Sequence, residues 1–270
     1  MSRICSLREA VATIRSGSTV TFGGFQSNRA PMALIRELIR QKKKRLHLLL
    51  LPNPLALDFL VGAGAVRFAE VAFAGLELEH RSLVPPNWQA AVARPPRRGI
   101  GWRERDAIYL VEALRAAALG APFLPLPIPP GSAPQSDVAG VRDPFRGCVV
   151  PVVRALEPEV ALIHAQAADR QGNVWIDDPV TDELVTRASR SVLVTTEEIV
   201  PRLRHATLPS VLVDYVVHSP GGAWPTACAG YYGEDGRHIG EYVAMVRAGR
   251  FREYLRRYVA TAECARHLVQ

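Results

Sequence analysis

The sequence predicts an α/β fold: an open, mostly parallel sheet flanked by helices. Short apolar runs alternate with segments of helical periodicity, which is the pattern of βαβ units. Some of these runs, such as Leu46–Leu51, are apolar nearly throughout, as in strands that are buried on both faces. The 270 residues suffice for one large α/β domain or two small ones. We expect a single domain over residues 1–270, with a Pro-rich crossing loop near residues 121–147.

The first elements carry clear end signals. Ser6 and Glu9 form a capping-box pattern at the start of a helix, and Gly17 follows as its stop. Thr19–Phe22 reads as a short strand, and Pro31 is suited to the first position of the next helix.

The later elements continue the alternation. Strands are expected at 46–51, 69–74, 160–165, 174–176, 192–195 and 211–217, and helices at 55–63, 107–119, 182–189 and within 235–267. Six prolines between Ala121 and Pro134 remove backbone donors, so this stretch is neither a helix interior nor a central strand. We interpret it as a crossing loop between two α/β halves, an active-site lid, or both.

Composition and charge exclude several classes of protein. The formal charge is +7, but the basic residues are spread along the chain, aromatics make up only 7%, and no nucleic-acid-binding motif occurs. The basic run Arg36–Arg45 reads as the solvated end of a helix. No apolar stretch approaches the length of a membrane span, and no secretory signal is visible. We therefore expect a cytoplasmic protein that binds neither nucleic acid nor membrane.

Cysteine and histidine spacing gives no sign of a metal centre. The four cysteines form no CxxC pair, and the seven histidines show no HxxxH spacing. We expect reduced thiols, most of them packing in the interior, and no bound metal. His164 lies in a buried strand pattern, which favours a core histidine with satisfied hydrogen bonds over a catalytic base.

Two glycine pairs follow predicted strands. Gly23 and Gly24 stand between the strand Thr19–Phe22 and the next helix, where backbone N–H groups could bind an anion or a developing oxyanion. The alternative is a tight strand-to-helix turn. Gly221 and Gly222 follow the predicted strand 211–217 and could line the same edge of the sheet, or form a plain loop.

Six carboxylates lie at strand ends or helix starts, where each could be an acid in a cleft: Glu77, Glu79, Glu104, Asp106, Glu197 and Glu198. Of these, Glu77, Glu104 and Asp106 are candidates for a substrate pocket. Each alone is more typical of a helix cap or a surface charge, because helix starts and loops favour acidic residues. Neither a GxSxG elbow nor a P-loop is present.

The motifs, taken in order, resemble the A subunit of family I coenzyme A transferases of the glutaconate CoA-transferase type. The resemblance rests on Gly23-Gly-Phe-x-x-x-Arg-x-Pro31 followed by Leu-Ile-Arg-Glu-Leu, and on Pro52-Asn-Pro54, Gly62-Ala-Gly64, Gly75-Leu-Glu77, Leu114 to Phe123, His164-Ala-Gln-x-Ala-Asp169, Gln171-Gly-Asn173, Thr196-Glu-Glu-Ile-Val-Pro201, Val213-Asp-x-Val-Val217 and Pro220-Gly-Gly222. These motifs cover most of the chain.

The resemblance implies a heteromeric enzyme of the CoA-transferase fold, with acyl-CoA and a carboxylic acid as substrates and no permanently bound cofactor. A glutamate of the B subunit would attack the thioester, giving an anhydride and then a glutamyl-CoA thioester. The loop of Gly23, Gly24, Phe25, Gln26, Ser27, Asn28 and Arg29 would meet the thioester, with oxyanion donors from Gly24 to Asn28. No glutamate here is followed by Gly or Asn-Gly, so the nucleophile is expected in the partner subunit.

Two alternatives remain open. A sister group in the same superfamily hydrolyses CoA thioesters during steroid-ring opening, with an Asp-Glu-Gly before the helix that corresponds to 107–119. The glutamate of that pattern falls on Ala107, although Glu104 and Asp106 flank the position. The other alternative is a CoA-binding or partner-binding protein without turnover.

Overall fold

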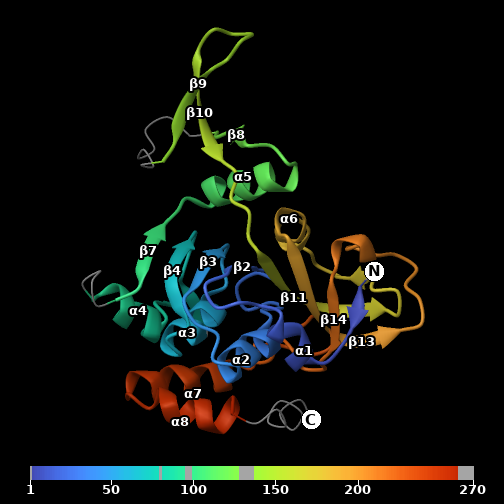
Figure 1. Ribbon diagram of the computed structural model, residues 1–270. Coiled ribbons are helices and arrows are strands. Elements are labelled where there is room, and N and C mark those ends of the chain that lie inside the picture. Colours follow the sequence, from blue (N-terminus) through green and yellow to red (C-terminus); the bar gives the residue numbers. More distant parts are fainter. Residues whose placement is uncertain (1, 79–80, 95–98, 128–136, 261–270) are drawn as a thin grey trace.

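A nine-stranded sheet forms the centre of the molecule in the computed structural model, which describes residues 2–78, 81–94, 99–127 and 137–260 (Figure 1). In spatial order its strands are β1 (Arg3–Ile4), β14 (Tyr215–His218), β13 (Ser191–Val200), β11 (Val160–Asp169), β2 (Thr19–Phe22), β3 (Leu46–Leu50), β4 (Val66–Val71) and β7 (Gly101–Glu104), with β12 (Val174–Trp175) beside β11. All neighbours are parallel except β12. The predicted fold class is confirmed.

Helices cover both faces of this sheet. One face carries α1 (Leu7–Ala12), α2 (Met32–Arg40), α3 (Pro54–Gly62), α4 (Pro86–Val92), α7 (Gly236–Arg247) and α8 (Phe251–Tyr258), and the other carries α5 (Ala107–Ala118) and α6 (Asp182–Ala188). Strand residues alternate between the two apolar cores: Leu48 and Leu50 belong to the first, and Leu49 to the second. This alternation explains why the strands read as continuous apolar runs.

Several predicted helix and strand ends in the first half of the chain agree closely with the structure, but β4 begins and ends three residues before its predicted range. The Ser6–Glu9 capping box is present, whereas α1 ends at Ala12, so Gly17, with a φ of +93°, is not its stop as predicted. Strand β2 matches its predicted range, and α5 ends one residue before the prediction. Strands β11 and β13 are longer than expected, since each continues past its apolar run into polar but buried residues such as Gln166.

Two expectations from the sequence are wrong. Arg36 was expected on a solvated helix end, but it is buried: its guanidinium donates to the Trp224 carbonyl at 2.6 Å and lies over the indole ring. The expected strand 211–217 is instead a 3₁₀ turn at Ser210–Leu212 followed by β14.

Two small antiparallel sheets flank the main one. Strands β8 (Phe123–Pro125), β10 (Val149–Arg154) and β9 (Ala139–Arg142) form an arm that projects from the body beyond α5 (Figure 1). Part of the expected crossing loop at 121–147 is therefore β-structure, with Pro125 in an edge strand as its missing donor requires. Residues 128–136 lie outside the described part. The hairpin of β5 (Leu76–Leu78) and β6 (Arg81–Leu83) follows β4.

Both ends of the described chain pack against the opposite half of the molecule. β1 pairs with β14, whereas α7 and α8 cover α3 and α4. Phe59 of α3 stacks on Tyr242 of α7 with ring centroids 4.6 Å apart. Among the described residues, no helix combines the length and apolarity that a membrane crossing requires.

Candidate functional site

The two glycine segments meet at the carboxyl edge of the sheet. We call residues 23–29 the first glycine loop and residues 219–232 the second. The Arg29 N–H donates to the Ala227 carbonyl at 2.7 Å, and the Ala227 N–H donates to the Ser27 carbonyl at 2.8 Å. Beyond the end of β2, strands β11 and β13 run on beneath both loops. The two loops therefore lie together at the edge where ligands bind in open parallel sheets, which makes them the candidate site.

Gly24 is required by the backbone itself. Its φ is +72°, and a Cβ at this position would lie 2.5 Å from the Arg29 carbonyl oxygen. Its N–H donates to Asp182 Oδ1 at 2.9 Å, and its carbonyl accepts from the Thr181 hydroxyl and from the Asn53 amide. The Gly24 peptide is thus fixed by the protein rather than open to a ligand.

Most backbone donors of the first glycine loop are already engaged. Gly23, Phe25, Gln26, Asn28 and Arg29 donate to the carbonyls of Leu162, Asn28, Pro52, Phe25 and Ala227, at 2.7 to 2.9 Å. Within the described ranges, the Ser27 N–H has no acceptor. The loop therefore presents one available backbone donor instead of a row of them.

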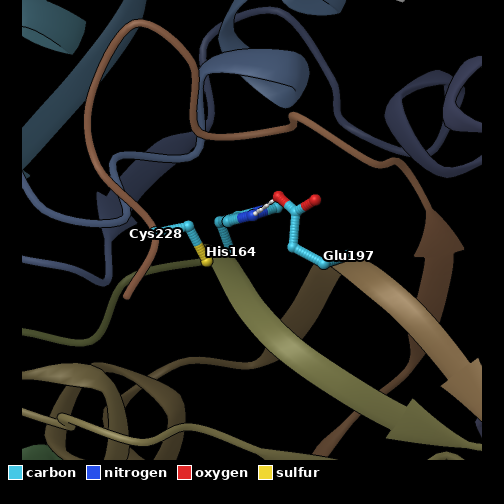
Figure 2. Close-up of side chains that lie close together, drawn as sticks. All are labelled: His164, Glu197 and Cys228. Carbon is cyan, nitrogen blue, oxygen red and sulfur yellow. Dashed lines mark hydrogen bonds and ion pairs between the residues drawn. The ribbon is translucent and has the colours of Figure 1, made fainter. Parts of the chain in front are cut away.

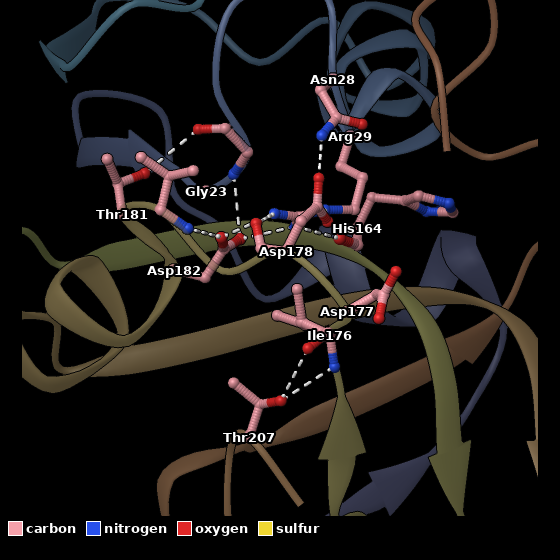
Figure 3. A network of polar contacts seen from close by, with 12 residues as sticks. Gly23, Asn28, Arg29, His164, Ile176, Asp177, Asp178, Thr181, Asp182 and Thr207 are labelled. Carbon is pink, nitrogen blue, oxygen red and sulfur yellow. Dashed lines mark hydrogen bonds and ion pairs between the residues drawn. The ribbon is translucent and has the colours of Figure 1, made fainter. Parts of the chain in front are cut away.

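Arg29 anchors the first glycine loop from below (Figure 3). Its side chain is fully buried and bonds the carboxylates of Asp178 and Asp182 and the carbonyls of Asp178 and His164. Burial opposes the charge, yet the bonds to Asp182 and Asp178 raise the pKa of Arg29 above its ordinary value. The Asn28 amide also donates to Asp178. Sequence reasoning included Arg29 in the loop but missed both aspartates.

A second buried network lies beside the first, around Glu197 of β13. His164 Nε2 lies 2.7 Å from Glu197 Oε1 (Figure 2). The Tyr232 hydroxyl donates to the same oxygen at 2.5 Å. The Gly221 N–H donates to Glu197 Oε2 at 2.7 Å. Burial raises the pKa of Glu197, but the contacts with His164, Tyr232 and Gly221 outweigh it, so the pKa falls below its usual value.

His164 itself is the satisfied core histidine that the sequence predicts. It is fully buried, and its Nδ1 lies 2.9 Å from the Thr195 hydroxyl, which bonds the Ile163 carbonyl. Sequence reasoning placed Glu197 only among several equivalent acids. A sharper signal was available, because successive strand residues alternate sides and one of two adjacent glutamates in β13 had to face inward.

Cys228 completes a group of three potential metal ligands. Its sulfur and the nearest ligand atoms of His164 and Glu197 lie within 4.8 Å of one another (Figure 2). Burial, followed by the Glu197 charge, raises the pKa of Cys228 to about 12, which keeps it a neutral thiol. The ligand atoms of His164 and Glu197 already have hydrogen-bond partners. A hydrogen-bonded network accounts for this arrangement without a metal ion.

Three of the other predicted carboxylates lie towards the β4–β7 side of the sheet, Glu198 is an exposed residue of β13, and Glu79 lies outside the described residues. Glu77 is an exposed residue of β5, and Asp106 caps α5 by accepting from the Ile108 N–H at 2.8 Å. Glu104 ends β7 and lines a hollow of about 350 Å³ whose walls include Trp88 and Trp102. The structure therefore places Gly221 and Gly222 in the loop whose Ala227 bonds the first glycine loop, and it places these three acids elsewhere.

Two further carboxylates with shifted pKa values, Asp58 and Asp137, lie away from the loops. Asp58 is fully buried and accepts from the Tyr242 hydroxyl and from the Trp88 N–H, and burial raises its pKa to about 6. Asp137 accepts two bonds from the guanidinium of Arg105, which lowers the pKa of Asp137 to about 2.

Known proteins with similar sequences share this organisation. A model of the coenzyme A transferase family matches residues 4–219. The chain is 34% identical over 252 residues to the A subunit of the 3-oxoadipate CoA-transferase of Pseudomonas knackmussii, covering 88% of this chain and 86% of that one. It is 28% identical to a cholesterol ring-cleaving hydrolase IpdA subunit of Rhodococcus jostii, covering 96% and 92%. It is also 34% identical to an uncharacterized Archaeoglobus fulgidus protein, of which it spans 58%.

Solved structures match nearly the whole chain. The decarboxylase AibA/AibB superposes with a TM-score of 0.90 at 44% identity, over 94% of this chain and 97% of that chain. Glutaconate coenzyme A-transferase from Acidaminococcus fermentans superposes with a TM-score of 0.84 at 25% identity, over 96% and 89%. With its parallel sheet, its paired glycine loops and a family match over residues 4–219, the chain belongs to the coenzyme A transferase family.

Proposed function

We propose that this chain is the A subunit of a two-chain enzyme that moves CoA from an acyl-CoA thioester to a carboxylic acid, with the nucleophilic glutamate in a B subunit. The relatives named as the A subunits of 3-oxoadipate and glutaconate CoA-transferases support this proposal. The partner's carboxylate would attack the thioester carbon and release CoA as a thiolate. That thiolate would then attack the resulting anhydride, releasing the first acid and leaving CoA on the glutamate for transfer to the second acid.

The observation that carries the proposal is the state of the carboxylates around the glycine loops. Asp178 and Asp182 are bound by Arg29, and Glu197 receives contacts from His164, Tyr232 and the second loop. A carboxylate whose oxygens are held in this way is a poor nucleophile. This supports an attacking acid that reaches the loops from another chain, as the lack of a Glu-Gly motif also predicts.

The contribution of this chain would be to stabilise the oxyanion. The Ser27 N–H is the backbone donor that the first glycine loop leaves without a protein acceptor in the described part of the chain, and a donor of this kind typically contributes about 10²- to 10³-fold to turnover. We therefore place the thioester oxygen at Ser27 instead of Gly24. The side chains of Gln26 and Asn28 flank this position in sequence.

A second candidate is decarboxylation of an acyl-CoA, because a decarboxylase structure matches this chain at 44% identity and a TM-score of 0.90. The proposed role of this chain and the need for a partner are the same in both. The two candidates differ in the product and in the groups that the partner supplies. Ring-opening hydrolysis is a third outcome that the same assay detects.

One reconstitution experiment tests these candidates. The chain is purified alone and with the protein encoded by the neighbouring reading frame, and both samples receive a panel of dicarboxylic acyl-CoA thioesters. Acid-dependent exchange of CoA, by the pair only, is the expected result. CO₂ release without an acceptor acid identifies the decarboxylase, and acceptor-independent hydrolysis identifies the hydrolase. Transfer by the lone chain contradicts the two-subunit proposal.

A further inference from the structure

One buried carboxylate connects both ends of the second glycine loop. Glu197 Oε2 accepts from the N–H of Gly221, near the start of this loop, and Glu197 Oε1 accepts from the hydroxyl of Tyr232, its last residue. Glu197 is 6% exposed, so these bonds form away from water, where hydrogen bonds to a charged group are strong. The carboxylate therefore holds a stretch of twelve residues, from 221 to 232, by hydrogen bonds at both ends of that stretch.

The second loop in turn holds the first. Its middle residue Ala227 bonds Ser27 and Arg29 at 2.8 and 2.7 Å. The Gly222 carbonyl accepts from the Ala33 N–H at 2.8 Å, at the start of α2. Each of these bonds comes from a segment that Glu197 secures, although Glu197 itself touches no residue of the first loop among the described contacts.

His164 contacts the same group of residues: Glu197, Arg29 of the first loop and Gly222 of the second. Its Nε2 contacts Glu197, and the His164 backbone carbonyl accepts from the Arg29 guanidinium at 3.2 Å. The second loop packs so closely on the ring that a Cβ on Gly222 would lie 2.7 Å from it. The carboxylate, the imidazole and both loops thus form one connected structure.

We propose that Glu197 is a positioning residue of the thioester site: it holds the second glycine loop against the first and so fixes the direction of the Ser27 N–H. This inference rests on the proposed function. The Ala227 N–H bonds the Ser27 carbonyl, which belongs to the peptide unit that follows the one carrying the Ser27 N–H. Loosening the second loop therefore frees the backbone dihedrals of Ser27, about which its N–H can turn. A donor that must be aimed at a developing oxyanion loses its effect when it can turn.

The chain contains a matched control for this proposal. Glu198, the next residue of β13, accepts from the Tyr231 hydroxyl at 2.8 Å, the same kind of contact between adjacent residues. Both Glu198 and Tyr231 are exposed, and neither bonds a backbone group of the loops through its side chain in the described contacts. Tyr231→Phe therefore removes an equivalent hydroxyl–carboxylate contact, and Glu198→Gln neutralises an equivalent carboxylate, while both leave the contacts of Glu197 in place.

The first test needs no partner protein. Tyr232→Phe, Glu197→Gln, Tyr231→Phe and Glu198→Gln are compared by hydrogen exchange of the purified chain. We expect amides of residues 23–29 and 219–232 to exchange about tenfold faster in the first two variants and to be unchanged in the controls. Unchanged exchange in both Tyr232→Phe and Glu197→Gln, or an equal increase in all four, overturns the proposal.

The second test uses the reconstituted complex with the acyl-CoA that it turns over. Tyr232→Phe should lower kcat about tenfold with little change in KM, because the lost orientation matters in the transition state, and the two control variants should stay within about twofold. A wild-type kcat in Tyr232→Phe beside faster exchange overturns the positioning role while the proposed function stands. A wild-type pair that turns over no thioester overturns the proposed function, and this inference with it.

Discussion

The clearest quantitative consequence of the geometry concerns Gly24→Ala, compared with Gly64→Ala. Both glycines have a similar positive φ, +72° and +67°. They differ in their surroundings, because a Cβ at Gly24 would meet the Arg29 carbonyl oxygen at 2.5 Å, whereas a Cβ at Gly64 would meet nothing within 4 Å. The pair therefore separates the cost of the backbone conformation from the cost of the clash.

The expected loss of stability has two contributions, one from the backbone conformation and one from the clash. A left-handed alanine costs about 1–2 kcal/mol, which applies to both variants. Forcing an extra carbon into a closely packed site adds about 1–3 kcal/mol, which applies to Gly24→Ala alone. At about 2–4 °C per kcal/mol for a chain of this size, Gly24→Ala should melt about 2–12 °C below Gly64→Ala.

Thermal unfolding followed by circular dichroism measures this difference, and urea unfolding of the same variants gives the free energies. Equal melting temperatures for the two variants would refute the reasoning, since they would mean that the first glycine loop accommodates a Cβ at Gly24 without a further loss of stability. A loss of activity in Gly24→Ala would not by itself locate the oxyanion donor, because the variant disturbs the whole loop.

Three individual groups lead to further predictions. Because the pKa of Asp58 is raised to about 6, its stabilising contribution is complete below about pH 4 and is lost as the pH rises through 6. The difference in unfolding free energy between wild type and Asp58→Asn should thus shift by about 3 kcal/mol between about pH 4 and pH 8 in urea titrations. Ser27→Pro should lower turnover of the reconstituted complex about 10²-fold, whereas Ser27→Ala, which keeps the N–H, should leave it unchanged. Asp137→Ala should destabilise the chain by about 1–3 kcal/mol at pH 7 in urea unfolding, because the buried Arg105 loses one of its anionic partners, and the difference from wild type should vanish as the pH falls through about 2. A pH-independent effect of Asp137→Ala would contradict the ion-pair explanation.

The main sheet could be predicted from sequence because most of its strands carry local signals. Thr19–Phe22 ends at a glycine pair, and α5 follows its N-cap Asp106 with regular apolar spacing, so the predicted ranges of both elements agree with the structure to within one residue. Strand β7 was missed because Gly101–Glu104 is an exposed edge strand with charged residues and no apolar alternation. The arm was missed because its strands contain glycine and proline and bury little.

Of the candidate site, the glycine loops could be predicted from the sequence, whereas the partners of Arg29 could not. The glycine loops are visible in the sequence because φ > 0 and close backbone approach demand glycine itself. The partners of Arg29 could not be predicted from the sequence, since Asp178 and Asp182 lie about 150 positions away. Nothing in their sequence context distinguishes them from surface aspartates. Arg36 was misplaced because charge was used as a sign of exposure, whereas the Trp224 carbonyl and ring make burial tolerable.

Both ends of the described chain pack against residues that are distant in sequence, and this affects how the chain folds during its synthesis. Arg3 of β1 pairs with Tyr215, 212 positions later, so at about 5–20 residues per second the first strand remains without its neighbour for on the order of 10–40 s. The helices that cover Phe59 come later still, since Tyr242 lies in α7. A growing chain therefore presents the apolar face of its first half until residues 236–258 have left the ribosome. Chains that stop short of α7 should aggregate or be captured by chaperones.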